Sequence, residues 1–261
     1  MRTISDLYGF SGEEVWNSPH EIIECKRALS PSSLPGIDYA LNPYGGCEHG
    51  CIYCYAPEVT HTPWSQWRVV KVKSNIISRL GKELPNVSGT IGIGTVTDPY
   101  QAAESRFELT RACLKKLKAD GFRVHLHTKS DLILRDLDTI EGMKGDFAVT
   151  ITTLDDRISK RTEPGAPLPE NRLRALKELT DIGADTYALI GPIFSTLDGK
   201  EGEFVDAIAS TGVRRMYIDK FNERPMLKQR TDVVKLSGSN AALENIRRLA
   251  TAKGIKVFDV F

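Results

Sequence analysis

The stretch Asn42-Pro-Tyr-Gly-Gly-Cys-Glu-His-Gly-Cys-Ile-Tyr-Cys-Tyr55 follows a short apolar run, residues 37–42, and decides how the rest of the chain is interpreted. Its cysteines, Cys47, Cys51 and Cys54, have the spacing C-x3-C-x2-C. Three thiols this close in sequence converge only if the loop curls around a shared centre, and its glycines allow the positive φ angles that such a curl needs. Thiolates are the usual ligands of iron–sulfur clusters, most of which have four. The loop therefore predicts an iron–sulfur cluster with three protein ligands and one iron open to an outside ligand.

Two other interpretations of the cysteines stay open at this point. The three cysteines and His49 form a Cys3His donor set of the kind that binds structural zinc, although the short spacing around His49 strains a tetrahedral site. Free core cysteines are the second alternative, which a polar, glycine-rich loop disfavours. The two remaining cysteines are predicted to be packing residues, because Cys113 has helical spacing to apolar neighbours and Cys25 follows an apolar pair.

Beyond the loop, apolar runs alternate with segments of 3.6-residue periodicity, such as residues 104–117, 172–179 and 241–249. Strands that alternate with helices predict βαβ units and a mainly parallel sheet. Six or seven such units suit an open or closed α/β barrel better than two domains. The predicted strands are residues 37–42, 89–96, 122–128, 147–153, 186–193, 215–221 and 255–261.

Length and composition narrow the class of protein. The 261 residues are assigned to an N-terminal extension, 1–35, and a barrel domain, 36–261, joined at the turn-rich segment SPSSLPG, 30–36. A net charge of +1 argues against a protein that coats nucleic acid, although a local basic groove stays possible. No apolar run reaches membrane-spanning length, and residues 1–16 lack a secretory pattern. Five cysteines, three of them within eight residues, suit a reducing cytoplasm.

With the aromatic Tyr53 before its last cysteine, the motif resembles that of the radical S-adenosylmethionine (radical SAM) superfamily. The wider run, 42–56, is similar to the branch related to spore photoproduct lyase, a DNA repair photolyase-like group. Further matches occur in the same order over residues 37–195. They are Thr97-Asp98-Pro99-Tyr100-Gln101, Thr128-Lys129-Ser130, Arg135-Asp136 and Glu163-Pro…Ala166-Pro167…Arg172-Leu173.

This resemblance implies a partial (β/α)6 TIM-like barrel of parallel strands that carries a 4Fe–4S cluster. The open iron would chelate the amino and carboxylate groups of S-adenosylmethionine (SAM). An electron from the reduced cluster would cleave SAM to methionine and a 5′-deoxyadenosyl radical, which abstracts hydrogen from an unidentified substrate. An electron donor such as ferredoxin or flavodoxin is the implied partner. The protein itself supplies orientation and excludes water.

Candidate SAM contacts lie at strand ends, where parallel α/β barrels place their chemistry. Thr97 and Asp98 are expected to accept hydrogen bonds from the ammonium of the methionine moiety, with an Asp-Pro turn as the structural alternative. Lys129 is expected to neutralise the carboxylate, with an exposed strand-end lysine as the alternative.

Four further residues are predicted to contact SAM. Tyr53 would pack against adenine, or simply pack in the loop, and Gly191 would let backbone pass close to a flat ring, or only mark a strand end. Glu163 and Arg172 would contact ribose or carboxylate groups, with a surface ion pair as the alternative.

The substrate side is less specific. Trp64 and Trp67, interleaved with basic residues, suit stacking on bases, although covering the barrel is the favoured interpretation. His125 and His127 share one strand face and are predicted to be polar packing of the barrel interior. The candidate substrate contacts, which follow or end predicted strands, are Tyr100, Gln101, Tyr217, Asp219 and Lys220.

Two other functions stay open. The first is a nucleic-acid lesion repair lyase of the spore photoproduct type. Those lyases use a cysteine near the end of the second strand, however, and residues 94–98 contain none. The second is a non-catalytic iron–sulfur or zinc-binding protein, which has no need for polar residues at successive strand ends. No second cysteine cluster follows downstream, so an auxiliary cluster is not expected.

Overall fold

One curved sheet organises the computed structural model, which describes residues 20–219, 225–228 and 236–260. Within these residues, seven parallel strands lie side by side in the order of the sequence, and the antiparallel strand β2 (Leu29–Pro31) borders the first of them. The parallel strands are β3 (Tyr39–Leu41), β6 (Thr90–Ile93), β7 (Arg123–Thr128), β8 (Gly145–Thr150), β9 (Thr186–Ile190), β10 (Arg215–Ile218) and β11 (Lys256–Asp259).

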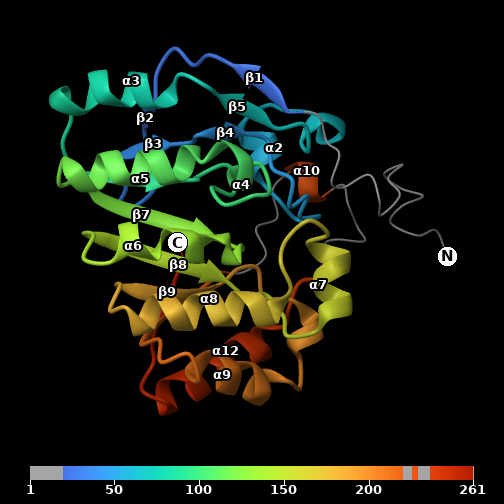
Figure 1. Ribbon diagram of the computed structural model, residues 1–261. Coiled ribbons are helices and arrows are strands. Elements are labelled where there is room, and N and C mark those ends of the chain that lie inside the picture. The colour runs from blue at the N-terminus through green and yellow to red at the C-terminus, as the bar shows by residue number, and fades with distance from the viewer. Residues whose placement is uncertain (1–19, 220–224, 229–235, 261) are drawn as a thin grey trace.

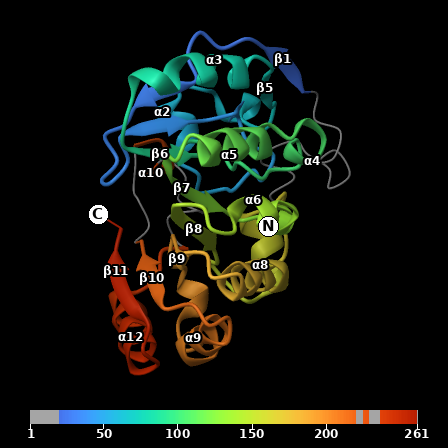
Figure 2. The same ribbon diagram turned by 60° about the vertical axis from the view of Figure 1, so that its left-hand side comes forward.

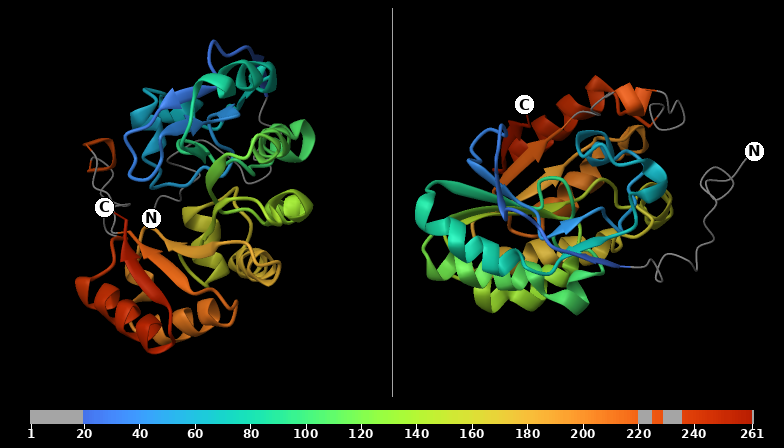
Figure 3. Two further views of the ribbon diagram at one scale, coloured as in Figure 1. Left: turned by 90° about the vertical axis from the view of Figure 1, so that its left-hand side faces the viewer. Right: turned by 90° about the horizontal axis from the view of Figure 1, so that it is seen from above.

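The sheet is an open barrel because its two edges, β2 and β11, do not pair with each other. Figure 3 shows the early strands and the last strand at opposite ends of a crescent. Helices cover the convex side (Figure 2). The predicted α/β class and partial barrel are therefore confirmed. Each of the seven predicted strand segments overlaps one of the parallel strands, and β8 begins two residues before its predicted segment, 147–153.

Helices connect successive strands, as Figure 1 shows. They are α2 (Ala56–Val59), α3 (Ile76–Glu83), α4 (Glu104–Phe107), α5 (Leu109–Ala119), α6 (Leu137–Ile140), α7 (Asp156–Thr162), α8 (Pro169–Asp181), α9 (Glu201–Ala209), α10 (Pro225–Lys228) and α12 (Asn240–Ala252). Short 3-10 helices are η2 (Trp64–Gln66), η3 (Leu84–Asn86), η4 (Asp131–Asp136) and η5 (Ser195–Leu197). Across the described residues, none of the helices combines the length and apolar character that a membrane crossing requires.

The helix predicted at 104–117 is interrupted, because Glu108 has a φ of +49° between α4 and α5. The buried Glu104 carboxylate explains the break. It accepts hydrogen bonds from the backbone N–H groups of Thr110 and Arg111, at 2.8 and 3.1 Å, and so satisfies donors that the first turn of α5 leaves free. Of the predicted apolar stripe, Cys113, Leu114 and Leu117 are buried in the main core, Leu109 is partly buried beside it, and Phe107, in α4, packs against a second cluster.

A second, three-stranded sheet supports the cysteine loop. Its order is β1 (Glu21–Ile23), β5 (Lys71–Lys73) and β4 (Tyr44–Gly45). Strand β4 leads directly into the first cysteine. The sequence pattern predicted neither β1 nor β5, because each has three residues and is only partly buried.

Alternation along β7 separates two environments. Val124 and Leu126 lie in the core between sheet and helices. His125 and His127 point to the other, concave side, where both are partly buried. The pleat therefore turns the two histidines away from the helices and into the barrel.

Candidate functional site

Backbone hydrogen bonds fasten the cysteine loop, residues 46–54, to segments distant in sequence. One contact is to the segment after η2, and two are to the end of α7 and the turn that follows it. The bonds run from Cys47 N–H to the Trp67 carbonyl (2.9 Å), from Ile52 N–H to the Thr162 carbonyl (2.9 Å) and from Gly165 N–H to the His49 carbonyl (3.0 Å). The loop is therefore held across the carboxyl end of the barrel.

Two glycines make this close packing possible. Gly46 has a φ of +76°, and a Cβ there would lie 2.7 Å from the carbonyl oxygens of Trp67 and Val69. A Cβ on Gly165 would lie 2.1 Å from the carbonyl oxygen of Glu48. Positive φ angles occur at Gly46 and Gly50, as the curl of the loop requires.

Gln101 is fully buried and positions the loop. Its amide nitrogen donates to the Gly46 carbonyl (3.3 Å) and to Thr97 Oγ1 (3.0 Å), and its amide oxygen accepts from Glu48 N–H (2.8 Å). Thr97 Oγ1 also donates to the Gly46 carbonyl, at 2.5 Å. Thr97 and Gln101 thus bind the loop backbone, and the structure leaves no exposed Gln101 surface for the expected substrate contact.

The Asp98 carboxylate is surrounded by donors at the end of β6. It accepts hydrogen bonds from Thr128 Oγ1 (2.7 Å) and from the backbone N–H groups of Lys129 (2.8 Å) and Tyr100 (2.9 Å). His49 Nδ1 lies 3.3 Å from Asp98 Oδ2, within ion-pair distance. Burial opposes ionisation, but His49 and these hydrogen bonds hold the pKa of Asp98 well below its usual range. Asp98 therefore joins the cysteine loop to the end of β7.

Glu163 and Arg172 form a buried ion pair, with Arg172 Nη1 2.5 Å from Glu163 Oε2. The Tyr53 hydroxyl donates to the same carboxylate, as does Thr152 Oγ1 at 3.0 Å. Burial tends to raise the pKa of Glu163, but Arg172 and Lys129 lower it below the usual value. The alternative of a surface ion pair was wrong, because α7 and α8 enclose both side chains.

Lys129, at the end of β7, faces this group. Its Nζ lies 5.5 Å from the centre of the Tyr53 ring. Burial alone would lower the pKa of Lys129. The Cys51 thiol and the Glu163 carboxylate raise it by more than burial lowers it, so the pKa lies above its usual value. The lysine is therefore a fixed cation beside the second cysteine.

The five cysteines are free thiols. Cys47 and Cys51 are buried and Cys54 is partly buried. Burial raises the pKa of Cys51 to about 12, which Lys129 opposes. Trp67, packed against Cys47, has a buried Nε1 that lacks a hydrogen-bond partner. Soft sulfur donors in a tightly held loop, next to a fixed lysine cation, suit a cluster that binds thiolates.

His49 is directed at Asp98, so its ring does not complete a Cys3His set with the cysteines. Within the described ranges, no three or more His, Cys, Asp and Glu side chains gather around one metal-ion position. This arrangement speaks against single-ion zinc in the loop. A cluster differs, because each cysteine binds a different iron.

The other substrate candidates occupy different places. Tyr100 is buried and its hydroxyl donates to Asp136 (3.0 Å), so its side chain points into the protein and not toward a substrate. Tyr217 is partly buried on the concave side. Asp219 directly follows β10. Burial raises its pKa to about 6, and a Cβ on Gly191 would lie 3.0 Å from the Asp219 Cβ. Lys220 lies outside the described residues.

The aromatic and basic segment after the loop supports it from outside. Trp67 is buried and offers no stacking face, which agrees with the favoured interpretation. Arg68 Nη2 donates to the Glu48 carbonyl (3.4 Å) and Lys73 Nζ to the Asn42 carbonyl (2.8 Å). Sequence reasoning also missed Glu48, whose buried carboxylate accepts from Ala103 N–H at 2.6 Å. Its position inside the cysteine motif was the available signal.

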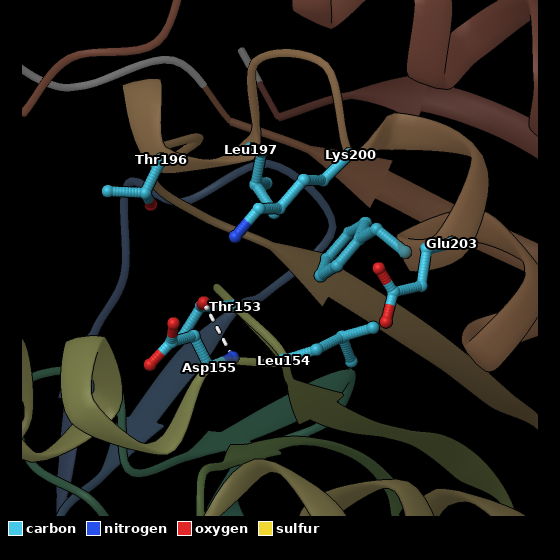
Figure 4. A pocket seen from close by; sticks show the side chains of 8 residues that line it. Thr153, Leu154, Asp155, Thr196, Leu197, Lys200 and Glu203 are labelled. Carbon is cyan, nitrogen blue, oxygen red and sulfur yellow. Dashed lines mark hydrogen bonds between the residues drawn. The ribbon is translucent and has the colours of Figure 1, made fainter.

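A separate pocket of about 230 Å³ lies between the loop after β8 and the η5–α9 segment (Figure 4). It contains none of the predicted site residues. Its lining residues are Thr153, Leu154, Asp155, Thr196, Leu197, Lys200, Glu203 and Phe204.

An open parallel barrel with a three-cysteine loop across its strand ends defines a class of enzymes that work through a metal cluster. The family model of the radical SAM superfamily matches residues 41–201, and the chain belongs to that superfamily. It is therefore a radical SAM enzyme, a family that implies a 4Fe–4S cluster and SAM as cofactors.

Relatives in sequence occur in archaea and bacteria. An uncharacterized protein of Methanocaldococcus jannaschii is 35% identical over 188 residues, covering 69% of this chain and 71% of its own length. An uncharacterized protein of Mycobacterium tuberculosis is 32% identical over 206 residues, covering 72% of this chain. The matched region spans only 59% of that mycobacterial protein.

Solved structures share the fold. A spore photoproduct lyase complexed with dinucleoside spore photoproduct has a TM-score of 0.70 at 14% identity, covering 97% of this chain and 85% of that one. Streptococcus suis SuiB bound to SAM has a TM-score of 0.59 at 14% identity, covering 84% of this chain and 49% of that one. At these identities the likeness shows the fold alone.

Proposed function

We propose that Cys47, Cys51 and Cys54 hold a 4Fe–4S cluster with one open iron, and that the enzyme cleaves SAM there and abstracts hydrogen from a substrate. The observation that carries this proposal is the attachment of the loop to three successive strand ends. His49 of the loop contacts Asp98, which follows β6 and accepts from Lys129 at the end of β7. Tyr53 of the loop donates to Glu163, which also accepts from Thr152 just after β8.

When bound, the reduced cluster supplies the electron that cleaves SAM to methionine and a 5′-deoxyadenosyl radical, which takes a hydrogen atom from the substrate. The chain binds and orients the reactants. Lys129, a fixed cation beside Cys51, neutralises the methionine carboxylate. Asp98 acts chiefly by positioning, because its oxygens already accept three hydrogen bonds.

The remaining predicted contacts shape the SAM site. Glu163 and Arg172 fix the Tyr53 hydroxyl, so that its ring is held between the loop and Lys129. Tyr53 then packs against the adenine. Gly191 follows β9 and lies against Asp219, and because it has no side chain the backbone there can approach the flat adenine ring. Thr97 holds the loop and offers its hydroxyl oxygen to the ammonium.

The physiological setting follows from this chemistry. A cluster that must be reduced suits a reducing cytoplasm, and a ferredoxin or flavodoxin is the proposed electron donor.

Anaerobic reconstitution tests the proposal. The full chain, given iron and sulfide, should become brown with about four irons per chain. With dithionite and SAM it should release 5′-deoxyadenosine and methionine in equal amounts. A colourless chain with one tightly bound zinc, or a four-iron chain that leaves SAM intact, would overturn the proposal.

Lesion repair is a second candidate, which the similarity to spore photoproduct lyase favours. The absence of a cysteine at 94–98 weighs against it. Incubating the reconstituted chain with an oligonucleotide that contains the spore photoproduct decides between them. Restored thymines support repair, and unchanged lesions during normal SAM cleavage eliminate it.

A further inference from the structure

Three donor atoms meet on the concave side of the barrel, apart from the cysteine loop. His125 and His127 extend from β7 and Tyr187 from β9. His127 Nε2 lies 2.7 Å from His125 Nε2, and the Tyr187 hydroxyl lies 3.0 Å from His125 Nε2. The Tyr187 hydroxyl also contacts His127 Nε2. Each of the three atoms therefore touches the other two.

The sheet register brings these side chains together. His127 is paired with Ala148 on β8, and Ala148 is paired with Tyr187 on β9. The Ala148 side chain is a single methyl group, so the larger residues on either side meet across β8. His125 lies two residues before His127 and thus on the same face.

Hydrogen bonds alone do not satisfy this triangle. An imidazole nitrogen has one in-plane site, which carries either a proton or a lone pair. The Tyr187 hydroxyl can donate to His127 and accept from His125. The contact between the two Nε2 atoms is then left over, because the only in-plane site on each is already used. A cation at the centre would accept a lone pair from all three atoms at once.

The three donors are close enough to share a metal ion once they move apart slightly. Ligands about 2.0–2.1 Å from one tetrahedral zinc ion stand about 3.3 Å apart, so each of the three contacts opens when the ion enters, the His127–Tyr187 contact most of all. Behind His125, Asp146 Oδ2 lies 3.9 Å from Nδ1. Arg123 and Arg215 hold this carboxylate, at 2.6 and 2.9 Å. A shift of less than 1 Å would let this carboxylate accept a hydrogen bond from His125 Nδ1–H, as carboxylates behind metal-bound histidines commonly do.

We propose that His125, His127 and Tyr187 bind a divalent first-row transition-metal ion, which is a second metal site separate from the cysteine loop. Imidazole nitrogen suits Zn²⁺, Cu²⁺, Ni²⁺ and Fe²⁺. In the described part of the chain no third His, Cys, Asp or Glu joins the two histidines. The Tyr187 oxygen is the third ligand and solvent completes the shell. The two histidines are then ligands as well as interior packing.

Zinc alone is the probe, with the reconstituted holoenzyme so that iron occupies the loop cysteines. Equilibrium dialysis against buffered Zn²⁺ should give one zinc per chain with iron content unchanged. Zinc X-ray absorption should show only nitrogen and oxygen neighbours, with imidazole features. A wild-type chain without zinc at micromolar free Zn²⁺, or sulfur in the zinc shell, would overturn the site.

Matched variants locate the ion. H125A and H127A should lose the zinc, and His61→Ala, at an exposed histidine, should retain it. Tyr187→Phe keeps the ring and should lower the affinity. Asp146→Asn should lower it by about 10–100-fold, as loss of an outer-shell partner does. Unchanged zinc affinity in Tyr187→Phe and Asp146→Asn would overturn the assignment even if the histidine variants fail to fold.

Discussion

Two buried thiols in this chain show that burial alone does not decide whether a cysteine is a ligand or a packing residue. Cys51 in the loop is 8% exposed and Cys113 in α5 is fully buried, and burial raises the pKa of both thiols. Their electrostatic neighbours have opposite effects. Lys129 lowers the pKa of Cys51, whereas Glu104 raises that of Cys113 further. Both thiols are harder to ionise than a free cysteine, and the difference lies in the neighbouring charge, a cation beside Cys51 and a carboxylate beside Cys113.

The backbone around the two cysteines differs as well. Cys113 lies within a regular helix, where its neighbours Leu114 and Leu117 face the same core. The loop around Cys51 depends on distant segments and on glycine contacts that tolerate no Cβ. A ligand site is thus recognised by what holds it and which charges face it, more than by how deeply it lies.

Cys51→Ala gives the largest expected effect. Losing one of three thiolates should abolish 5′-deoxyadenosine formation and reduce the iron bound after reconstitution. Cys47→Ala and Cys54→Ala should behave alike. Iron analysis and product chromatography measure the result. SAM cleavage at the normal rate in any of these variants would remove that residue from the ligand set.

Gly165→Ala comes next. Its Cβ would meet the Glu48 carbonyl oxygen at 2.1 Å, so the loop or the turn must shift. We expect a loss of about 1–3 kcal/mol in the free energy of unfolding, as for overpacking, together with poorer iron incorporation. Gly202→Ala in α9 is the control, because a Cβ there meets nothing within 4 Å. Equal denaturation midpoints for the two variants would contradict the close approach.

Lys129→Met tests the charge difference between the two thiol environments. It keeps the aliphatic stem over Tyr53 and removes the cation. Hydrogen bonds to charged groups contribute about 1.5–3 kcal/mol, so SAM should bind about 10–100-fold more weakly while iron content stays unchanged. Lys177→Met, at an exposed lysine paired with Asp181 on α8, is the control. Calorimetric titration with SAM gives both affinities, and equal values would refute the carboxylate role.

Much of the barrel could be predicted from sequence because its strands are apolar runs separated by amphipathic helices. The local pattern could not reveal β1 and β5, which are three residues long. It also missed the break at Glu108, which depends on the Glu104 side chain turning back to the start of α5. Short strands of a small sheet and side-chain caps depend on tertiary contacts that periodicity does not encode.

The site divides in the same way. The cysteine spacing is local, so it could be recognised in the sequence. The contact of Tyr53 with Glu163 joins residues 110 positions apart and could not be predicted from a local pattern. Tyr100 and Gln101 follow a strand end, as substrate contacts often do, yet their side chains turn inward to Asp136 and the loop. Strand-end position therefore predicts proximity to the site, but side-chain direction depends on which buried partners need a hydrogen bond.

Cys113→Ala should give the smallest effect, and it tests the packing cysteine of α5 against the loop cysteine Cys51. The thiol packs in the core near Leu114 and Leu117, so its removal should cost on the order of 1 kcal/mol in unfolding free energy. Iron content and SAM cleavage should equal those of the parent chain. Denaturant unfolding and product formation measure both. Loss of iron here would mean that the helix thiol shares in the cluster, and surrounding charge would then fail as the criterion that separates a ligand from a packing cysteine.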